Sequence, residues 1–325
     1  MKIFFKLLNS LWLWISVIQF IIIIIYYFNN VRPYLMGFPE SADNYNLMFL
    51  SSDVFIYWIN ALETPLNLVP INLLGPVLIF KLSDLKFDLI FLLNIILFCI
   101  AIREIYHYTP IKTLKFVALI LINPAIIGQF YAANKEVMII ISLLFISVYF
   151  YSGATRHIIY AIIIAFFSKP EFLVLIIMYF SSLKLPAALR KYILISIIMV
   201  VSFSYNYIPN IESYSTVLFR GQTVNSFGLT VLLHELAVEY YLYWAVIIPR
   251  LLLSIYSGGF LYAPIFISFL LFVLLKKKIT LSNDLIYFLY LFYIMVSIVP
   301  FPLFRYIMPT ISLLLFIAMQ PKSKN

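Results

Sequence analysis

The residues able to do chemistry in this sequence are isolated ionisable side chains in or beside long apolar runs. Carboxylates and histidine can act as general bases, while lysine and arginine can bind phosphate or carboxylate groups. These candidates are Asp43, Asp53, Glu63, Lys135, Glu136, Lys169, Glu171, Glu212, Arg220, His234, Glu235, Glu239, Arg250 and Arg305. An ionised group at membrane depth is costly, so each is a candidate for a functional role.

The common sequence motifs of soluble enzymes are missing from the chain. It contains no HExxH, CxxC, GxSxG or GxGxxG sequence and no Walker A loop. Those motifs carry the zinc ligands, redox thiols, nucleophilic serine and phosphate-binding turns of their enzyme classes. The sequence therefore indicates neither a metal nor a soluble cofactor, and any chemistry depends on the isolated charges.

The composition places these charges in a membrane protein. Apolar residues make up 64% of the 325 positions and charged residues only 11%. Soluble domains have about half apolar and a quarter charged residues. Several apolar runs approach the roughly 20 residues that a helix needs to cross a bilayer. We predict an all-α, polytopic integral membrane protein that forms a single membrane domain over residues 1–325.

About ten transmembrane helices are expected, some of them broken or re-entrant. They are placed near residues 7–28, 66–82, 88–105, 114–131, 136–153, 158–181, 191–208, 258–275, 284–300 and 303–319. Asn123-Pro124 and Lys169-Pro170 interrupt two of these runs. Irregular backbone at membrane depth survives where it is buried in protein or lines a wet cavity, so the breaks could line a site. The alternative is that they are plain helix ends joined by tight loops.

The basic residues predict the orientation of the chain. Under the positive-inside rule, Lys2, Lys6 and the lysines at 276–278 lie in the cytoplasm, and so do both termini. A simple count of spans leaves three basic residues on the outer side, against the rule. They are Arg103, Lys112 and Lys115. A re-entrant hairpin in a neighbouring segment would remove this conflict.

Two polar segments, about residues 29–65 and 206–257, are expected to form external loops. In the first, residues 41–63 are predicted to form a helix with Asp53, Tyr57 and neighbouring polar residues on one stripe. In the second, an apolar stripe predicts a helix lying on the membrane surface, with Glu235 and Glu239 on another face.

The candidate residues also have structural interpretations. Lys135 and Glu136 could be interfacial charges that end a loop, and Lys169 with Glu171 could be an ion pair at a helix break. His234 could be a packed or solvated residue. Arg220 and Arg250 are harder to dismiss, because an outward arginine gains nothing from the topology rule and its planar fork suits diphosphate or carboxylate. Arg305, between Pro302 and Pro309, fits a structural clamp and a phosphate ligand equally well.

Several of these features together resemble bacterial O-antigen and capsule repeat-unit polymerases of the Wzy type, and more loosely EpsG-like exopolysaccharide membrane proteins. They are Arg220 and Arg250 in an external loop, Asn-Lys-Glu at 134–136, Lys-Pro-Glu at 169–171, and Arg305-Tyr306 with Pro309. Many such polymerases have a glycine eleven positions after an external arginine. Here those positions hold Val231 and Leu261 instead, so the chain departs from this pattern.

The resemblance implies polymerisation of undecaprenyl-diphosphate-linked oligosaccharide units at the periplasmic face of the bacterial inner membrane, in O-antigen (lipopolysaccharide) or capsule biosynthesis. The acceptor's hydroxyl attacks the donor sugar as the diphosphate leaves, so the site needs cations and a base. The expected base is Glu235, His234 or Asp53. The expected diphosphate or substrate ligands are Arg220, Arg250, Arg305, Lys135 and Lys169. Expected partners are the lipid-linked substrate, the bilayer, a chain-length regulator and a flippase, and not nucleic acid.

Two other functions remain open at this stage. A glycosyltransferase of the GT-C architecture uses a lipid-phosphate sugar and usually carries an acidic pair in its first external loop. Here Asp43 is followed by Asn44 and Asp53 by Val54, so the pair is missing, although one acid could serve. A transporter or flippase would have repeated halves with matching broken helices, and no such repeat is visible.

Overall fold

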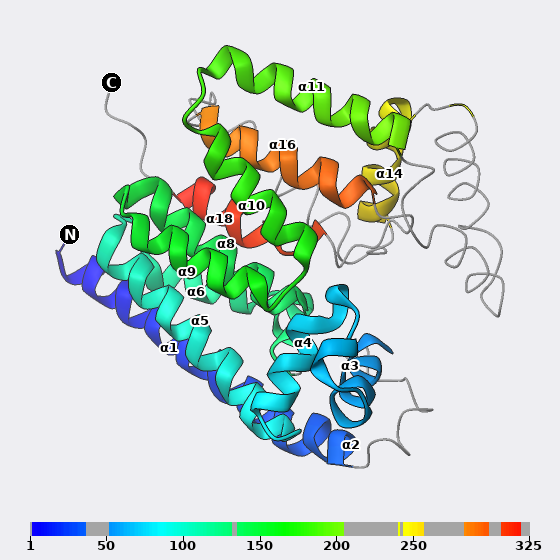
Figure 1. The fold of residues 1–325 in the computed structure, drawn as a ribbon. Coiled ribbons are helices and arrows are strands. Elements are labelled where there is room, and N and C mark those ends of the chain that lie inside the picture. The colour runs from blue at the N-terminus through cyan, green and yellow to red at the C-terminus, as the bar shows by residue number, and fades with distance from the viewer. Residues whose placement is uncertain are drawn as a thin grey trace. The chain divides into compact units, whose positions relative to one another are not determined.

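The computed structural model of the protein describes residues 2–36, 52–131, 135–204, 240, 243–256, 283–298 and 307–319. These parts are helical and contain no strand, which confirms the all-α prediction for the described residues (Figure 1). The chain divides into two compact units. Unit 1 comprises Met1–Leu173 with Met308–Asn325, and unit 2 comprises Val174–Ile307.

The helices of unit 1 are α1 (Lys2–Tyr26), η1 (Tyr27–Val31, a π-helix), α2 (Arg32–Met36), α3 (Ser52–Glu63), η3 (Leu66–Leu68, a 3₁₀ turn), α4 (Ile71–Leu82), α5 (Phe87–Tyr108), α6 (Thr113–Leu121), α7 (Pro124–Gln129), α8 (Lys135–Ser152), α9 (Thr155–Phe166) and α18 (Thr310–Met319). Helix α10 (Pro170–Ser182) begins in unit 1 and continues into unit 2. Unit 2 also contains α11 (Ala187–Ser204), α14 (Tyr243–Tyr256) and α16 (Asn283–Ile298), which contact one another.

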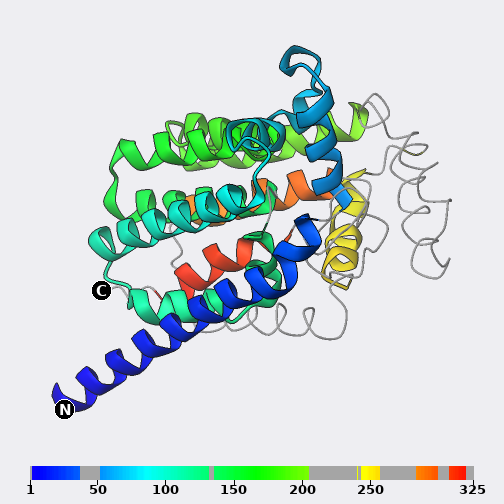
Figure 2. The same ribbon diagram turned by 90° about the horizontal axis from the view of Figure 1, so that it is seen from below.

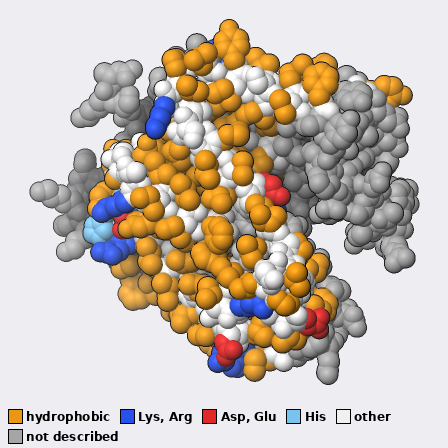
Figure 3. All heavy atoms as spheres, in the orientation of Figure 1, with side chains coloured by type: hydrophobic (Ala, Val, Ile, Leu, Met, Phe, Trp, Pro, Cys, Tyr) orange, Lys and Arg blue, Asp and Glu red, His pale blue; other side chains and the backbone are white. Residues whose placement is uncertain are grey.

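Three of the described helices are long and apolar enough to cross a membrane. They cover Leu11–Met36, Phe87–Tyr108 and Lys135–Ser152. Apolar side chains form most of the described surface visible in Figure 3, and basic side chains gather with a histidine at one edge. Apolar surface on this scale suits lipid rather than water. The structure thus indicates a membrane protein.

Helix α8 forms the centre of unit 1. Every residue from Lys135 to Val148 is buried, and α5, α9 and α18 contact this helix. Ser142 Oγ donates a hydrogen bond to the carbonyl of Ala161 in α9 at 2.9 Å. Apolar helices in lipid associate through such close packing and interhelical hydrogen bonds rather than through the hydrophobic effect. α8 is therefore the element against which the rest of the unit is positioned.

The segment 66–82 differs from the expected transmembrane span. It consists of η3 and the 12-residue α4, and a tight turn then leads into α5. In this turn Asp84 and Leu85 have φ values of 51° and 60°, and the amide of Leu85 donates to the carbonyl of Phe80 at 2.9 Å. Leucine rarely adopts this left-handed conformation, so surrounding contacts must maintain it.

The turn between α4 and α5 lies at the same end of unit 1 as the start of α2. Asp88, in the first turn of α5, binds Arg32 at the start of α2, with a 3.0 Å contact. Figures 1 and 2 both place α2 and α3 at the end of α1 away from the N-terminus. We call this the Arg32 end of unit 1. Because the chain is at this end both at Arg32 and at Asp88, we expect α3 and α4, which contact each other, to form a re-entrant pair in the membrane.

Helix α5 then runs from the Arg32 end to the N-terminal end of unit 1. Lys115, at the start of α6, has its Nζ 5.6 Å from the ring centre of Trp12 in α1. Ser16 Oγ donates to the carbonyl of Leu114 at 3.2 Å. The basic residues around the α5–α6 connection therefore lie with the N-terminus. With α3 and α4 re-entrant, as we expect, this arrangement would satisfy the positive-inside rule, which the simple span count does not.

We expect the α4–α5 turn and the α5–α6 loop to lie on opposite sides of the membrane, the latter in the cytoplasm. The native cysteine, Cys99, is the only one in the chain, so Cys99→Ser gives a background for single-cysteine labelling. A membrane-impermeant maleimide added to intact cells should label Asp84→Cys. It should label Lys112→Cys only after permeabilisation. Labelling of Lys112→Cys in intact cells would show that α4 crosses the membrane.

The expected span at 158–181 is divided into two helices. α9 ends at Phe166 and α10 begins at Pro170, with Lys169 in the connection between them. Proline has no backbone N–H to donate and suits the first position of a helix, which explains why α10 starts there. The break predicted at Lys169-Pro170 is thus a helix boundary.

Candidate functional site

A buried group of charges lies where α8 begins and α9 ends. Lys135 and Glu136 open α8 and are only 8% and 4% exposed. Lys169 Nζ lies 3.9 Å from Glu136 Oε1. Lys135 Nζ lies 5.1 Å from the ring centre of Tyr57 in α3. We call these four residues the Lys135 cluster.

Helix α4 helps to fix the position of Lys169. A Cβ atom built on Gly75 would lie 2.7 Å from the backbone carbon and oxygen of Phe167. The absence of a side chain therefore allows α4 to contact the end of α9 directly. Phe167 is two residues before Lys169, so this backbone contact helps to position the chain segment that carries the lysine.

The Lys135 cluster carries more positive than negative charge. It combines two lysines with one carboxylate, and Glu171, the next acid along the chain, is exposed. Removing charged groups from water costs several kcal/mol for each ion unless they are well paired. At 3.9 Å the contact between Lys169 and Glu136 is at the outer limit of an ion pair. Lysine ammonium groups are hydrogen-bond donors that suit an anionic ligand, so the Lys135 cluster is a candidate anion site.

A second polar group lies at the Arg32 end. Arg32 Nε is 3.1 and 3.0 Å from the two carboxylate oxygens of Asp88, and the Tyr27 hydroxyl donates to Asp88 Oδ1 at 2.8 Å. The Tyr27 ring stacks on Phe91, with 4.0 Å between centroids, and lies 6.1 Å from Tyr131. Tyr131 is four residues before Lys135. This aromatic group therefore connects the Arg32 end with the segment that leads into the Lys135 cluster.

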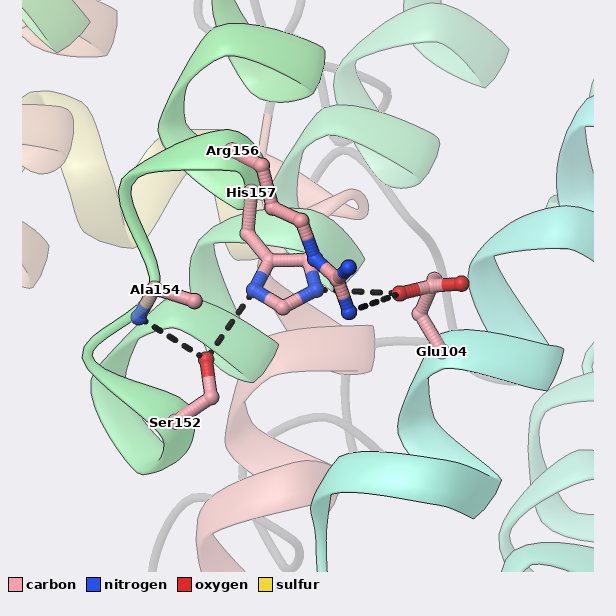
Figure 4. A network of polar contacts seen from close by, with 5 residues as sticks. All are labelled: Glu104, Ser152, Ala154, Arg156 and His157. Carbon is pink, nitrogen blue, oxygen red and sulfur yellow. Dashed lines mark hydrogen bonds and ion pairs between the residues drawn. The ribbon is translucent and has the colours of Figure 1, made fainter.

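A third polar group ties α5 to the α8–α9 turn (Figure 4). His157 is fully buried, and its Nε2 lies 3.0 Å from Glu104 Oε2 while its Nδ1 lies 3.0 Å from Ser152 Oγ. In a neutral ring beside an ionised Glu104, Nε2 is the donor and Nδ1 accepts the serine hydroxyl. Ser152 Oγ also accepts the amide of Ala154 at 3.2 Å, and Arg156 lies 3.6 Å from Glu104. The partners of His157 are thus helix-end groups, which indicates a structural role.

Of the residues expected to form the site, the structure brings Lys135 and Lys169 together around Glu136. Tyr57, expected on the polar stripe of an external helix, is buried beside them. Asp53 lies in the first turn of α3 and Arg250 lies in α14, but their side chains are outside the described residues. The other four residues are wholly outside the described part. They are Arg220, His234, Glu235 and Arg305.

Sequence reasoning missed the partners at both ends of unit 1. Arg32, Asp88, Glu104 and His157 all lie near the ends of apolar runs. Charges at run ends pair only if the runs end on the same side of the membrane. Because the simple span count placed α5 in the opposite orientation, it separated Arg32 from Asp88. The sequence did show that these charges lie near the ends of apolar runs. It did not show which of those ends lie on the same side of the membrane.

Among the described residues, no group of three or more His, Cys, Asp or Glu side chains is arranged to hold a metal ion. The lysines and the arginine of the described clusters are side chains that can bind anions. No protein-family model matches this chain, and no curated protein or solved structure matches it either.

Proposed function

We propose that this protein polymerises undecaprenyl-diphosphate-linked oligosaccharide units at the outer face of the bacterial inner membrane, in O-antigen or capsule biosynthesis. The observation that carries the proposal is the Lys135 cluster, in which two lysines lie around one buried carboxylate. Lysines in this setting can neutralise a departing diphosphate. The sequence resemblance to Wzy-type polymerases supplies the substrate class.

The charge distribution of unit 1 supports an outward-facing cluster. Lys112 and Lys115 lie with the N-terminus, the end that the positive-inside rule assigns to the cytoplasm. Lys135 is close to Tyr57 of the re-entrant pair, which enters from the opposite end. The Lys135 cluster is therefore expected on the outer side, where lipid-linked glycans are extended.

The proposal retains about ten membrane crossings. Making 66–82 re-entrant removes one crossing, and dividing 158–181 into α9 and α10 adds one. Lys184, Arg190 and Lys191 follow α10 and belong in the cytoplasm under the positive-inside rule, so α10 is expected to return there. The direction of the chain at α11 is consequently unchanged, and the loop at 206–257 remains external.

In the proposed reaction, the acceptor sugar's hydroxyl oxygen attacks the anomeric carbon of the donor chain. The new glycosidic bond forms as the bond from that carbon to the diphosphate oxygen breaks. The hydroxyl proton passes to Glu235, His234 or Asp53, and the charge of the leaving diphosphate is stabilised by Lys135 and Lys169. Arg220, Arg250 and Arg305 are proposed as further diphosphate ligands.

Deletion of the gene is expected to leave surface polysaccharide as single capped units without the long-chain ladder. A polymerase joins units that other proteins make and export, so its loss leaves each unit intact. The measurement is gel electrophoresis of the polysaccharide with sugar analysis of the units, and a plasmid copy of the gene should restore the ladder.

Two other outcomes of the deletion would contradict a polymerase. Loss of one sugar from every unit with normal chain length would indicate a GT-C-type glycosyltransferase. Accumulation of complete lipid-linked units on the cytoplasmic side would indicate a flippase. Neither function has a specific observation in its favour among the described residues.

A further inference from the structure

Arg32 is held through one nitrogen of its guanidinium group. Nε contacts both carboxylate oxygens of Asp88, at 3.1 and 3.0 Å. The guanidinium carbon lies 5.8 Å from the ring centre of Phe28. Within the described residues, neither terminal amino group of Arg32 makes a hydrogen bond. Four of the five N–H donors of this side chain therefore remain available.

The carboxylate that holds Arg32 is itself held in place. The Tyr27 hydroxyl donates to Asp88 at 2.8 Å, and the Tyr27 ring is fully buried against Phe91. Arg32 and Asp88 side chains are 41% and 44% exposed, so the pair lies at the surface of unit 1. The result is an oriented guanidinium, fixed on its Nε side and accessible to a ligand.

The position of Arg32 suits a phosphate carried by a lipid. The apolar segment Leu11–Met36 contains Arg32 near its end, so the guanidinium is expected at the level of the lipid headgroups. An arginine fork binds phosphate through paired N–H donors, and this geometry is one that lysine does not reproduce. A tie between α2 and α5 alone would not need the four remaining donors.

We propose that Arg32, oriented by Asp88 and Tyr27, forms a second anion site that binds the phosphate of a membrane lipid or lipid-linked substrate. The identity of the natural ligand rests on the proposed function. A polymerase handles two lipid diphosphates, one that leaves the donor and one that stays on the acceptor. The Lys135 cluster serves the first, and Arg32 serves the second.

The test is binding to the purified full-length chain in phosphatidylcholine nanodiscs, measured by native mass spectrometry. The probes are undecaprenyl diphosphate, phosphatidylglycerol and inorganic diphosphate. Arg32→Lys keeps the ion pair with Asp88 but removes the fork, and Arg32→Gln removes the charge. The control is Lys86→Gln, which changes an exposed lysine two residues before Asp88 that pairs with Asp84 at 3.0 Å.

We expect Arg32→Lys to weaken binding of at least one of the two lipid probes about tenfold, which is the effect of losing roughly one charge-assisted hydrogen bond. Arg32→Gln should weaken it further, and Lys86→Gln should leave it unchanged. Weaker undecaprenyl diphosphate binding alone would identify a substrate site, and an equal effect on phosphatidylglycerol would identify a general lipid-phosphate site.

Unchanged lipid binding in Arg32→Lys would overturn the inference, as would an effect confined to inorganic diphosphate. If Arg32→Gln does not fold, Arg32→Lys alone decides. These assays do not depend on polymer synthesis. A normal ladder in the deletion strain would therefore refute the polymerase while leaving an Arg32-dependent lipid site in place.

Discussion

A chain in which Glu136 and Lys169 are both replaced by glutamine is expected to reach normal abundance in the membrane but to make polymer about 100-fold more slowly. Lys169→Gln alone would remove the cation that contacts the buried Glu136 carboxylate at 3.9 Å, and breaking a buried ion pair destabilises a protein by up to about 3–5 kcal/mol. The double replacement avoids that penalty, because glutamine at both positions is neutral. The remaining defect then measures the loss of a cation from the anion site.

Glu136→Gln is the matched control for this comparison. It keeps both lysines of the Lys135 cluster and removes only the carboxylate, so synthesis should stay within a few-fold of normal. The measurement is ladder length and amount in the deletion strain, divided by the amount of protein in the membrane. If the double variant matches Glu136→Gln, then Lys169 serves only to neutralise Glu136 and the leaving-group assignment is wrong.

Gly75→Ala is expected to destabilise the protein by about 1–3 kcal/mol, the usual cost of forcing an extra group into a packed interior. Its Cβ would lie 2.7 Å from backbone atoms of Phe167, which cannot rotate away as a side chain could. Whether Gly75→Ala lowers or raises stability shows whether this contact is present. In a helix interior without that contact, alanine is more favourable than glycine by about 1 kcal/mol.

The measurement for Gly75→Ala is the midpoint of thermal unfolding in detergent. Ile71→Ala, on the same helix at a position that is 73% exposed, is the control and should change the midpoint little. We also expect Gly75→Ala to lower polymer synthesis per folded molecule, because α4 positions the connection that carries Lys169. A midpoint equal to or above that of the unmodified protein would show that α4 and α9 are not in backbone contact.

The sequence was sufficient to predict helices and a membrane location, because apolar content and run length are local properties. It was not sufficient to distinguish a crossing from a re-entrant segment. Residues 66–82 and 158–181 have similar hydropathy, yet the first forms a 3₁₀ turn and a short helix, which we expect to be re-entrant, and the second forms two helices. That difference depends on contacts such as Gly75 with Phe167, which join positions far apart in the chain.

The candidate site was predicted only in part. Lys135 and Lys169 could be identified because a charged side chain within an apolar run is energetically costly and therefore marks a candidate functional residue. Their meeting around Glu136 could not be predicted, since it requires the start of α8 to lie beside the end of α9. The pairing of Arg32 with Asp88 depends in the same way on the orientation of α5. The expected roles of Arg220, Arg250 and Arg305 remain predictions.

The short length of α9 has a consequence for the surrounding lipid. Its 12 residues extend about 18 Å, whereas the hydrocarbon layer of a bilayer is about 30 Å thick. Its exposed side chains include Ile159, Ile163 and Phe166. In the proposed topology, in which α9 crosses the membrane, lipid in contact with this face becomes thinner to match it, at a modest cost for each ångström of mismatch. We then expect the bilayer to be thinnest where α9 ends, which would bring headgroups and water towards Lys169 without any large movement of the protein.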